Sequence, residues 1–145
     1  MKLIIAGTRH FPAARLARTL IPLAVRRMQR VFGLDDVALV LCGERGGADT
    51  AGAIWARREG IHIREFEPTW VGNGRAAGTM RNARMVSQAD ALLLIWDGRS
   101  AGSADTLRKA LAKGLPVMEV ILAGEGTRFV DHQRAAAQLG LFEEA

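Results

Sequence analysis

The stretch 91–106, ALLLIWDGRSAGSADT, is the part of this sequence whose residue types and spacing best fit the binding of an anion. An apolar run, Ala91–Ile95, ends just before Asp97, and small residues then lead into a helical pattern. Because the first N–H groups of a helix lack intrahelical partners, a strand, a flexible turn and a helix start together form a phosphate cradle. A plain helix cap is the simpler alternative. We predict a phosphate-binding loop formed by Gly98, Ser100, Gly102 and Ser103.

Basic residues follow the ends of two other predicted strands. Gly7-Thr8-Arg9 offers backbone N–H groups, a hydroxyl and a guanidinium that can pair with phosphate through two N–H groups. Arg81, shortly after Gly78, can neutralise a phosphate, and Asn82 can hydrogen-bond a base or a backbone group. The alternatives are a solvated arginine in an ordinary turn and a surface helix start.

Carboxylates are the candidate acids and bases near these motifs. Gly47 and Asp49 open a predicted helix, where the helix dipole stabilises a carboxylate, and that role explains Asp49 fully. As a ligand contact, Asp49 would suit ribose hydroxyls or a base. Asp97 can accept from ribose hydroxyls or cap nearby N–H groups. Asp49 and Asp97 are the catalytic candidates, with Glu44 and Asp105 as further bases, a set that favours holding a nucleotide over cutting one.

A glycine-rich loop at 67–78 contains Trp70, which either stacks on a base or anchors the loop to the core. Trp55 and Trp96 are assigned to the core. The three histidines, His10, His62 and His132, are scattered, so we expect no metal site and no separate cofactor. No Walker A sequence or G-x-S-x-G elbow occurs.

Apolar runs that alternate with helical patterns predict the sheet that positions these motifs. Such alternation is typical of a parallel sheet covered on both faces, so we predict an α/β, three-layer Rossmann-like fold with a mostly parallel five-stranded sheet. If the strand order is 3-2-1-4-5, the motifs share one edge at the topological switch point, with Gly7 beside Gly98. The runs are Leu3–Ala6, Val37–Leu41, Ile61–Phe66, Ala91–Ile95 and Val117–Leu122.

The helices between these runs have recognisable starts and stops. One begins near Pro12, with Leu23 on its apolar face and a kink or break expected at Pro22. The next follows Gly47 and stops at Gly60. The last two cover about Met80–Gln88 and Ser103–Lys113, and in the second of them we expect Leu107, Ala110 and Leu111 to face inward.

Size and charge limit the classes of protein. The chain has 145 residues, 49% hydrophobic and 24% charged, which suits one domain at 1–123 followed by a C-terminal tail at 124–145. Within that tail, Asp131–Leu139 is the stretch expected to form a short helix that packs on the domain or on a partner. The net charge of +5 favours an anionic partner, which leaves nucleotide, nucleic acid and acidic protein open.

Apolar run length and cysteine content bear on location. No apolar run approaches membrane-spanning length, and the single cysteine, Cys42, is expected to be buried and suits a reducing cytosol. We therefore expect a cytoplasmic protein with no membrane partner. An outer helix or the tail offers a dimer face, so we also expect a homo-oligomer.

Over about residues 1–122 the sequence resembles the YspA-type (cpYpsA-related) branch of the SLOG superfamily. The resemblance implies a Rossmann-like domain that binds nucleotides or nucleotide derivatives, including ADP-ribose- or NAD-related ligands, with a link to stress, phage or conflict systems. It leads us to expect a nucleotide-binding sensor or effector domain. The shared motifs are Gly7-Thr8-Arg9, Gly47-Ala48-Asp49, Trp70 with Gly74-Arg75-Ala76-Ala77-Gly78, Arg81-Asn82, and Trp96-Asp97-Gly98-x-Ser100-x-Gly102.

Two other branches of the superfamily supply alternatives. The "lonely guy" phosphoribohydrolases carry P-G-G-x-G-T-x-x-E at the fourth strand, where this sequence has Thr106 in place of the catalytic glutamate. The neighbouring Asp105 is expected to point elsewhere on the helix, which weighs against N-glycosidic cleavage without excluding it. DNA-processing protein A binds single-stranded DNA, but no basic stripe interleaved with aromatics supports that function here.

Overall fold

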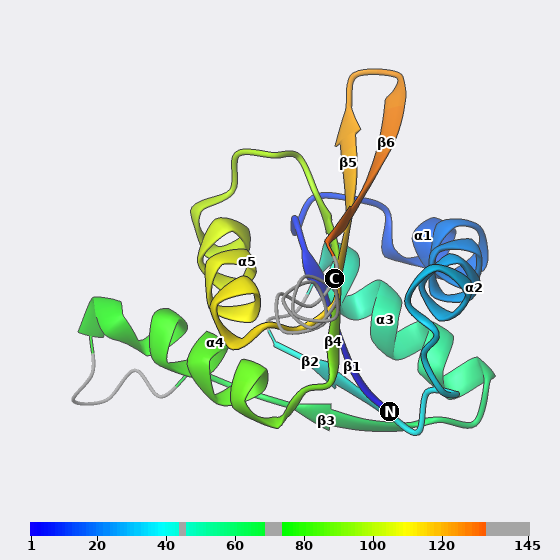
Figure 1. The fold of residues 1–145 in the computed structure, drawn as a ribbon. Helices are drawn as coiled ribbons and strands as arrows, with labels where there is room; N and C mark the ends of the chain where they lie inside the picture. The colour runs from blue at the N-terminus through cyan, green and yellow to red at the C-terminus, as the bar shows by residue number, and fades with distance from the viewer. Residues whose placement is uncertain (44–45, 69–73, 133–145) are drawn as a thin grey trace, which may run out of the picture.

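The computed structural model describes residues 1–43, 46–68 and 74–132, and a six-stranded sheet of order β3-β2-β1-β4-β5-β6 runs through its centre (Figure 1). The parallel strands are β1 (Lys2–Gly7), β2 (Leu39–Cys42), β3 (His62–Glu65), β4 (Ala91–Trp96) and β5 (Val117–Ala123). The sixth strand, β6 (Gly126–His132), is antiparallel to β5. The α/β fold is therefore confirmed, with one strand more than predicted, and the first five strands have the order 3-2-1-4-5 that was assumed.

Helices cover both faces of the sheet (Figure 1). On one face lie α1 (Ala13–Arg18), α2 (Leu20–Phe32) and α3 (Gly47–Arg58). On the other face lie α4 (Ala77–Gln88), which follows a short 3-10 turn at Gly74–Ala76, and α5 (Ala101–Lys113). None of the helices in the described ranges is long and apolar enough to span a bilayer.

The core explains why β4 is apolar along its whole length. Leu93 and Ile95 face α1, α2 and α3, whereas Leu92, Leu94 and Trp96 face α4 and α5, and every residue of β4 is buried. A strand covered on both faces cannot alternate with polar residues. The predicted burial of Trp55 and Trp96 is confirmed.

The helices depart from prediction in small ways. The break in the first helical segment falls at Thr19, because Pro22 occupies the first turn of α2, where its missing N–H is tolerated. Leu23 and Leu111 are 53% and 38% exposed, so their predicted inward placement is wrong. In α5 the buried side follows Ser103, Thr106 and Ala110, and Leu111 lies one residue beyond that stripe.

The extra strand β6 lies in the segment predicted to be a tail. The two-residue turn Gly124-Glu125 joins β5 to β6, and Gly124 has a φ of +59°, which glycine adopts readily. Asp131 pairs with Arg27 of α2 at 2.7 Å, and the Arg27 guanidinium lies 5.2 Å from the centre of the Phe129 ring. Since Asp131 and His132 end β6, the helix predicted from Asp131 is wrong at its start, and residues 133–139 lie outside the described ranges.

Candidate functional site

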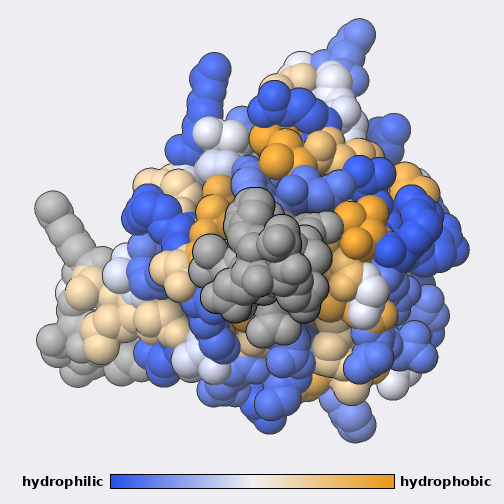
Figure 2. All heavy atoms as spheres, in the orientation of Figure 1, coloured by the Kyte–Doolittle hydropathy of each residue, from blue (hydrophilic) through white to orange (hydrophobic). Residues whose placement is uncertain are grey.

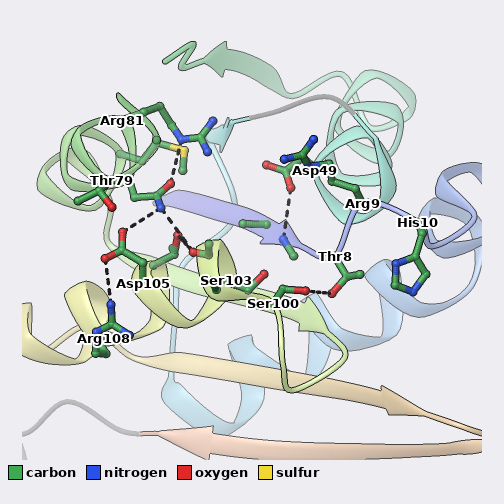
Figure 3. A pocket seen from close by; sticks show the side chains of 18 residues that line it. Thr8, Arg9, His10, Asp49, Thr79, Arg81, Ser100, Ser103, Asp105 and Arg108 are labelled. Carbon is green, nitrogen blue, oxygen red and sulfur yellow. Dashed lines mark hydrogen bonds and ion pairs between the residues drawn. The ribbon is translucent and has the colours of Figure 1, made fainter. Parts of the chain in front are cut away.

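A pocket of about 640 Å³ lies at the carboxyl end of β1 and is bordered by α3, α4 and α5 (Figure 3). The volume is in the range of small-molecule sites, and this end of a parallel sheet is where such folds bind ligands. Arg9 and Asp49 lie on one side of the pocket, with Thr79 and Arg81 on the other. The predicted residues that line it are Gly7, Thr8, Arg9, Asp49, Gly78, Arg81, Asn82, Ser100, Gly102 and Ser103.

The start of α3 is fixed by close backbone packing. Gly7 pairs with Ile95 of β4, and a Cβ on Gly7 would lie 1.7 Å from the Ile95 carbonyl oxygen. Gly47 has a φ of +49°, and a Cβ there would lie 1.9 Å from the Thr8 carbonyl oxygen. Both positions therefore require glycine for packing. We expected Gly7 to lie beside Gly98. The strand register instead pairs Gly7 with Ile95, three residues before Gly98 in the sequence.

Asp49 joins the ends of two strands. Its Oδ1 accepts a hydrogen bond from the Gly7 N–H at 3.3 Å, and its Oδ2 accepts one from the Gly43 N–H at 3.0 Å. The residue is 8% exposed and lies on the pocket wall. The first-turn role predicted for this carboxylate is thus extended to a brace between β1 and β2.

Three residues form a closed hydrogen-bonded ring between the β1 and β4 turns. Thr8 Oγ1 accepts from the Asp97 N–H at 3.1 Å and lies 3.2 Å from Ser100 Oγ. Ser100 Oγ donates to Asp97 Oδ1 at 3.0 Å. Because the Ser100 proton is used on the carboxylate, the Thr8 hydroxyl must donate to Ser100. The ring fixes both turns at the edge of the pocket.

The Asp97 carboxylate stabilises its own loop. Its Oδ1 accepts from the Arg99 N–H at 2.8 Å and the Ser100 N–H at 2.9 Å. These two hydrogen bonds lower the pKa of Asp97 to about 2, and the bond from the Arg99 N–H contributes most. Gly98 has a φ of +81°, and neither Asp97 nor Gly98 lines the pocket. The capping role weighed for Asp97 is therefore the one that the geometry supports.

The amide groups that have no intrahelical partner at the start of α5 belong to the next residues along the chain. The Ala104 N–H makes the first intrahelical bond of α5, to the Ser100 carbonyl at 3.0 Å. The N–H groups of Ala101, Gly102 and Ser103 precede that bond, and all three residues line the pocket. This first turn of α5 provides a place where an anion can be bound.

Two glycines at helix starts leave open space. Gly78 lies in the first turn of α4 and Gly102 in that of α5, and a Cβ on either would meet no atom within 4 Å. Both line the pocket, beside the hydroxyl groups of Thr79 and Ser103. These glycines are not required by packing, unlike Gly47.

Side chains, rather than close backbone contact, hold α4 and α5 together. Asn82 is 3% exposed, and its Nδ2 donates to Asp105 Oδ2 at 3.0 Å and to the Gly102 carbonyl at 3.4 Å. Its Oδ1 accepts from Arg81 Nε at 2.9 Å. Arg81 Nη1 also reaches the Phe66 carbonyl at 3.4 Å. Asn82 is therefore engaged on both sides of its amide.

Asp105 faces the pocket, so the expectation that it points elsewhere is wrong. Its carboxylate lies on the flank of α5 next to α4, where Asn82, Arg108 and Lys109 bind it. Desolvation opposes ionisation, but the hydrogen bonds from Lys109 and Asn82 and the charges of Lys109 and Arg108 outweigh it and lower the pKa of Asp105. Thr106 lines the same pocket and donates to the Gly102 carbonyl at 3.2 Å.

Some predicted residues lie elsewhere, and others were missed. Gly47 is buried beside the pocket without lining it, and Trp70 and Glu44 lie outside the described residues. Lining residues that were not predicted as part of the site include His10, Thr79, Thr106 and Arg108, and Asp105, which was named as a further base, lines the pocket too. The signal for Arg108 was its spacing of three from Asp105, which places both on one flank of α5.

Two further groups were assessed for chemistry. Cys42 is buried as predicted, and burial, followed by the nearby charges of Asp49 and Glu65, raises the pKa of its thiol to about 12. Within the described residues, no group of three or more His, Cys, Asp or Glu side chains is arranged to hold a metal ion.

Comparison with known proteins shows a similarity to a phage protein. The chain is 35% identical over 86 residues to the Gene 61 protein of Mycobacterium phage D29, and the match covers 55% of this chain and 69% of the phage protein. No family model matches the sequence.

Proposed function

We propose that this chain, which belongs to the same family as the Gene 61 protein of Mycobacterium phage D29, binds a nucleotide or nucleotide derivative as a sensor or effector domain. The name of the phage protein states no activity, so the proposal rests on the site. The observation that carries it is the convergence of two helix starts, at Gly78 and Gly102, on one pocket of about 640 Å³ that also receives Arg9, Arg81 and Arg108. The SLOG resemblance points to the same ligand class.

The phosphate position follows from which amides are already engaged. The Arg99 and Ser100 N–H groups bond to Asp97, so we assign the phosphate to the N–H groups of Ala101, Gly102 and Ser103. Arg9, an exposed residue that also lines the pocket, would neutralise its charge. Compared with the phosphate-binding loop predicted from the sequence, this assignment omits Gly98 and Ser100 and places the phosphate at the first turn of α5.

Other predicted contacts receive supporting roles. The carboxylate of Asp49 bonds to the chain through both oxygens, and the amide of Asn82 is engaged through both of its polar atoms. We assign these two residues, with Asp97, to shaping the pocket. Hydroxyl groups at its border, those of Thr79 and Ser103, are the donors that we assign to the sugar or the base.

Calorimetric titration with ADP-ribose, AMP and adenosine tests the proposal. We expect the two phosphate-bearing ligands to bind and adenosine to bind at least about tenfold more weakly, because charge-assisted hydrogen bonds contribute roughly 1.5–3 kcal/mol. Arg9→Gln should weaken AMP binding by about tenfold or more. Arg128→Gln, an exposed arginine on β6 that does not line the pocket, is the matched control and should bind as the parent does.

Two results would contradict nucleotide binding through phosphate. One is equal affinity for adenosine and AMP. The other is no heat from any of the three ligands at millimolar concentration, with the protein folded by circular dichroism.

A second function, N-glycosidic cleavage of a nucleotide, is favoured by one observation. Asp105 puts an ionised carboxylate on the pocket wall, next to the position where the related hydrolases have glutamate. A carboxylate there would stabilise an oxocarbenium-like centre. Incubation with AMP and ADP-ribose, followed by chromatography, should release adenine if this holds, and Asp105→Asn should abolish the release. Binding of AMP or ADP-ribose without any released adenine would contradict N-glycosidic cleavage and would leave nucleotide binding as the proposed function.

A further inference from the structure

The helices on the far side of the sheet from α4 and α5 carry an unusual charge pattern. Residues 13–32, which form α1 and α2, contain five arginines and no aspartate or glutamate. The first acidic residues that follow, Asp35 and Asp36, come after the end of α2 at Gly33. The basic surplus of the chain is therefore concentrated in these two helices.

Helical spacing places these charges on the outside. Leu23, Arg26, Arg27 and Arg30 recur at i, i+3, i+4 and i+7 of α2, which is one face of a helix. Arg27 is half-buried and engaged by Asp131 and the Phe129 ring, whereas Arg26 and Arg30 are exposed. The opposite face of α2 packs into the core through Ile21, Ala24, Val25 and Met28.

The short helix α1, which contacts α2, carries further exposed charge. Arg15 and Arg18 are exposed there, and hydrophilic side chains gather over α1 and α2 at the right of the molecule (Figure 2). We call Arg15, Arg18, Arg26 and Arg30 the arginine face. Within the part of the chain that the structure describes, none of these four guanidinium groups forms an ion pair or a hydrogen bond. Four cations are thus available to an outside partner.

We propose that the arginine face binds the phosphate backbone of duplex nucleic acid without reading its sequence. Guanidinium groups match phosphate oxygens in geometry and charge. Arg26 and Arg30 stand about 6 Å apart along the helix axis, four residues at a rise of about 1.5 Å. Duplex DNA presents a charge about every 1.7 Å of its axis, so adjacent phosphates lie within reach of both.

The composition of the surface favours this partner over the other anionic ones. A single-strand binder stacks bases on exposed aromatic side chains, and α1 and α2 expose none among their described residues. A stable protein interface has an apolar centre with anchoring side chains, whereas Leu23 is the one large apolar side chain that these helices expose in the described ranges. A surface that offers positive charge without large apolar or aromatic side chains is typical of binding to the phosphate backbone of nucleic acid.

Fluorescence anisotropy with a labelled 20-base-pair duplex tests the proposal. If all four arginines contact phosphates, the slope of log K against log salt should be about −3.6, and raising salt from 50 to 200 mM should weaken binding by about 10²-fold. Duplexes of different base composition should bind alike.

Matched double variants assign the binding to this surface. Arg26→Gln with Arg30→Gln should make the salt slope less steep by about 1.8, because two phosphate contacts are lost. Arg84→Gln with Arg128→Gln removes the same charge from exposed arginines outside α1 and α2, and should leave the slope unchanged. Circular dichroism is to be used to check that both variants are folded, and AMP titration reports on the pocket independently.

Three outcomes would overturn the proposal. The first is no duplex binding at 50 mM salt. The second is an equal change of slope in both double variants, which would mean that net charge alone is responsible. The third is tight binding to poly-glutamate, lost in the α2 double variant, with weak duplex binding, which would assign the surface to an acidic protein.

Discussion

The start of α3 and the starts of α4 and α5 border the same pocket, yet they are held there by different means. At the start of α3, two glycines allow direct contact between backbone segments. The Thr8 carbonyl oxygen occupies the space that a Cβ on Gly47 would need, and the Ile95 carbonyl oxygen occupies the space that a Cβ on Gly7 would need. The starts of α4 and α5 are instead joined through the Asn82 amide and the Asp105 carboxylate, and Gly78 and Gly102 face open space.

This difference separates the framework from the binding face. A helix start in backbone contact with a neighbouring strand has no room for a ligand. A helix start held at its flank by side chains keeps its first N–H groups accessible, as α5 does at Ala101–Ser103. Glycines that look equivalent in the sequence therefore have opposite roles, and substitution should distinguish them.

The largest expected effect is that of Gly47→Ala on stability. A methyl group would lie 1.9 Å from the Thr8 carbonyl oxygen in a residue with a φ of +49°, so α3 would have to move off β1. We expect a loss of about 4 kcal/mol or more in the free energy of unfolding, measured by urea denaturation.

Gly33→Ala is the matched control for this loss. Gly33 has a φ of +66°, but a methyl group added there would meet no atom within 4 Å, so it shares the backbone cost without the clash. We expect it to lose about 1 kcal/mol. Equal losses in the two variants would mean that backbone conformation, and not packing, makes Gly47 necessary.

The next largest effect is expected for Asn82→Leu. The substitution keeps the branched shape and the number of side-chain heavy atoms but leaves Arg81 Nε and Asp105 Oδ2 without their buried partner. The free energy of unfolding should fall by about 2 kcal/mol, because unsatisfied buried polar groups keep their desolvation cost. Ser87→Ala, which removes an exposed hydrogen bond from the same helix, should change it by less than about 0.5 kcal/mol. Similar effects from both variants would contradict a bracing role for Asn82.

The framework side of this comparison was largely predictable from the sequence. Continuous apolar runs such as Ala91–Ile95 indicated a doubly covered parallel sheet, and the strand order that was assumed for it, 3-2-1-4-5, is the order observed for those five strands. β6 was missed because Thr127 and Arg128 interrupt its apolar pattern, although the Gly124-Glu125 pair was a hairpin signal.

The binding side was predictable as a set of residues but less so in their roles. Sequence periodicity does not show which partner a polar side chain will bind. Whether Asp97 contacts a ligand or caps the N–H groups of its own loop was therefore decided only by the hydrogen-bond distances in the structure. Asp105 was misplaced because the pocket extends from the buried stripe of α5, at Ser103 and Thr106, onto the flank that carries Asp105. Such choices depend on contacts between helices distant in sequence.

A smaller effect is expected for Asp97→Asn, and it should depend on pH. Asp97 has a pKa of about 2 in the folded protein, below the ordinary value of 3.8, so its contribution to stability is present above about pH 4 and is lost as the pH falls toward 2. Because the side chain is largely solvated, we expect the variant to lose only about 1 kcal/mol at pH 7. Urea midpoints of parent and variant should converge between pH 5 and pH 2. A difference that stays constant over this range would contradict the assigned role.

The smallest change in stability, and the one of opposite sign, is expected for Gly102→Ala. Alanine favours the helix over glycine, and no atom lies within 4 Å of the added methyl group, so the free energy of unfolding should rise by up to about 1 kcal/mol. The same methyl group lies on a residue that lines the pocket, at the amides assigned to phosphate, and should weaken AMP binding by about tenfold. Urea denaturation and calorimetry on the same preparation measure both. Unchanged AMP affinity with raised stability would place the phosphate away from α5, whereas a loss of stability would mean that Gly102, like Gly47, belongs to the framework.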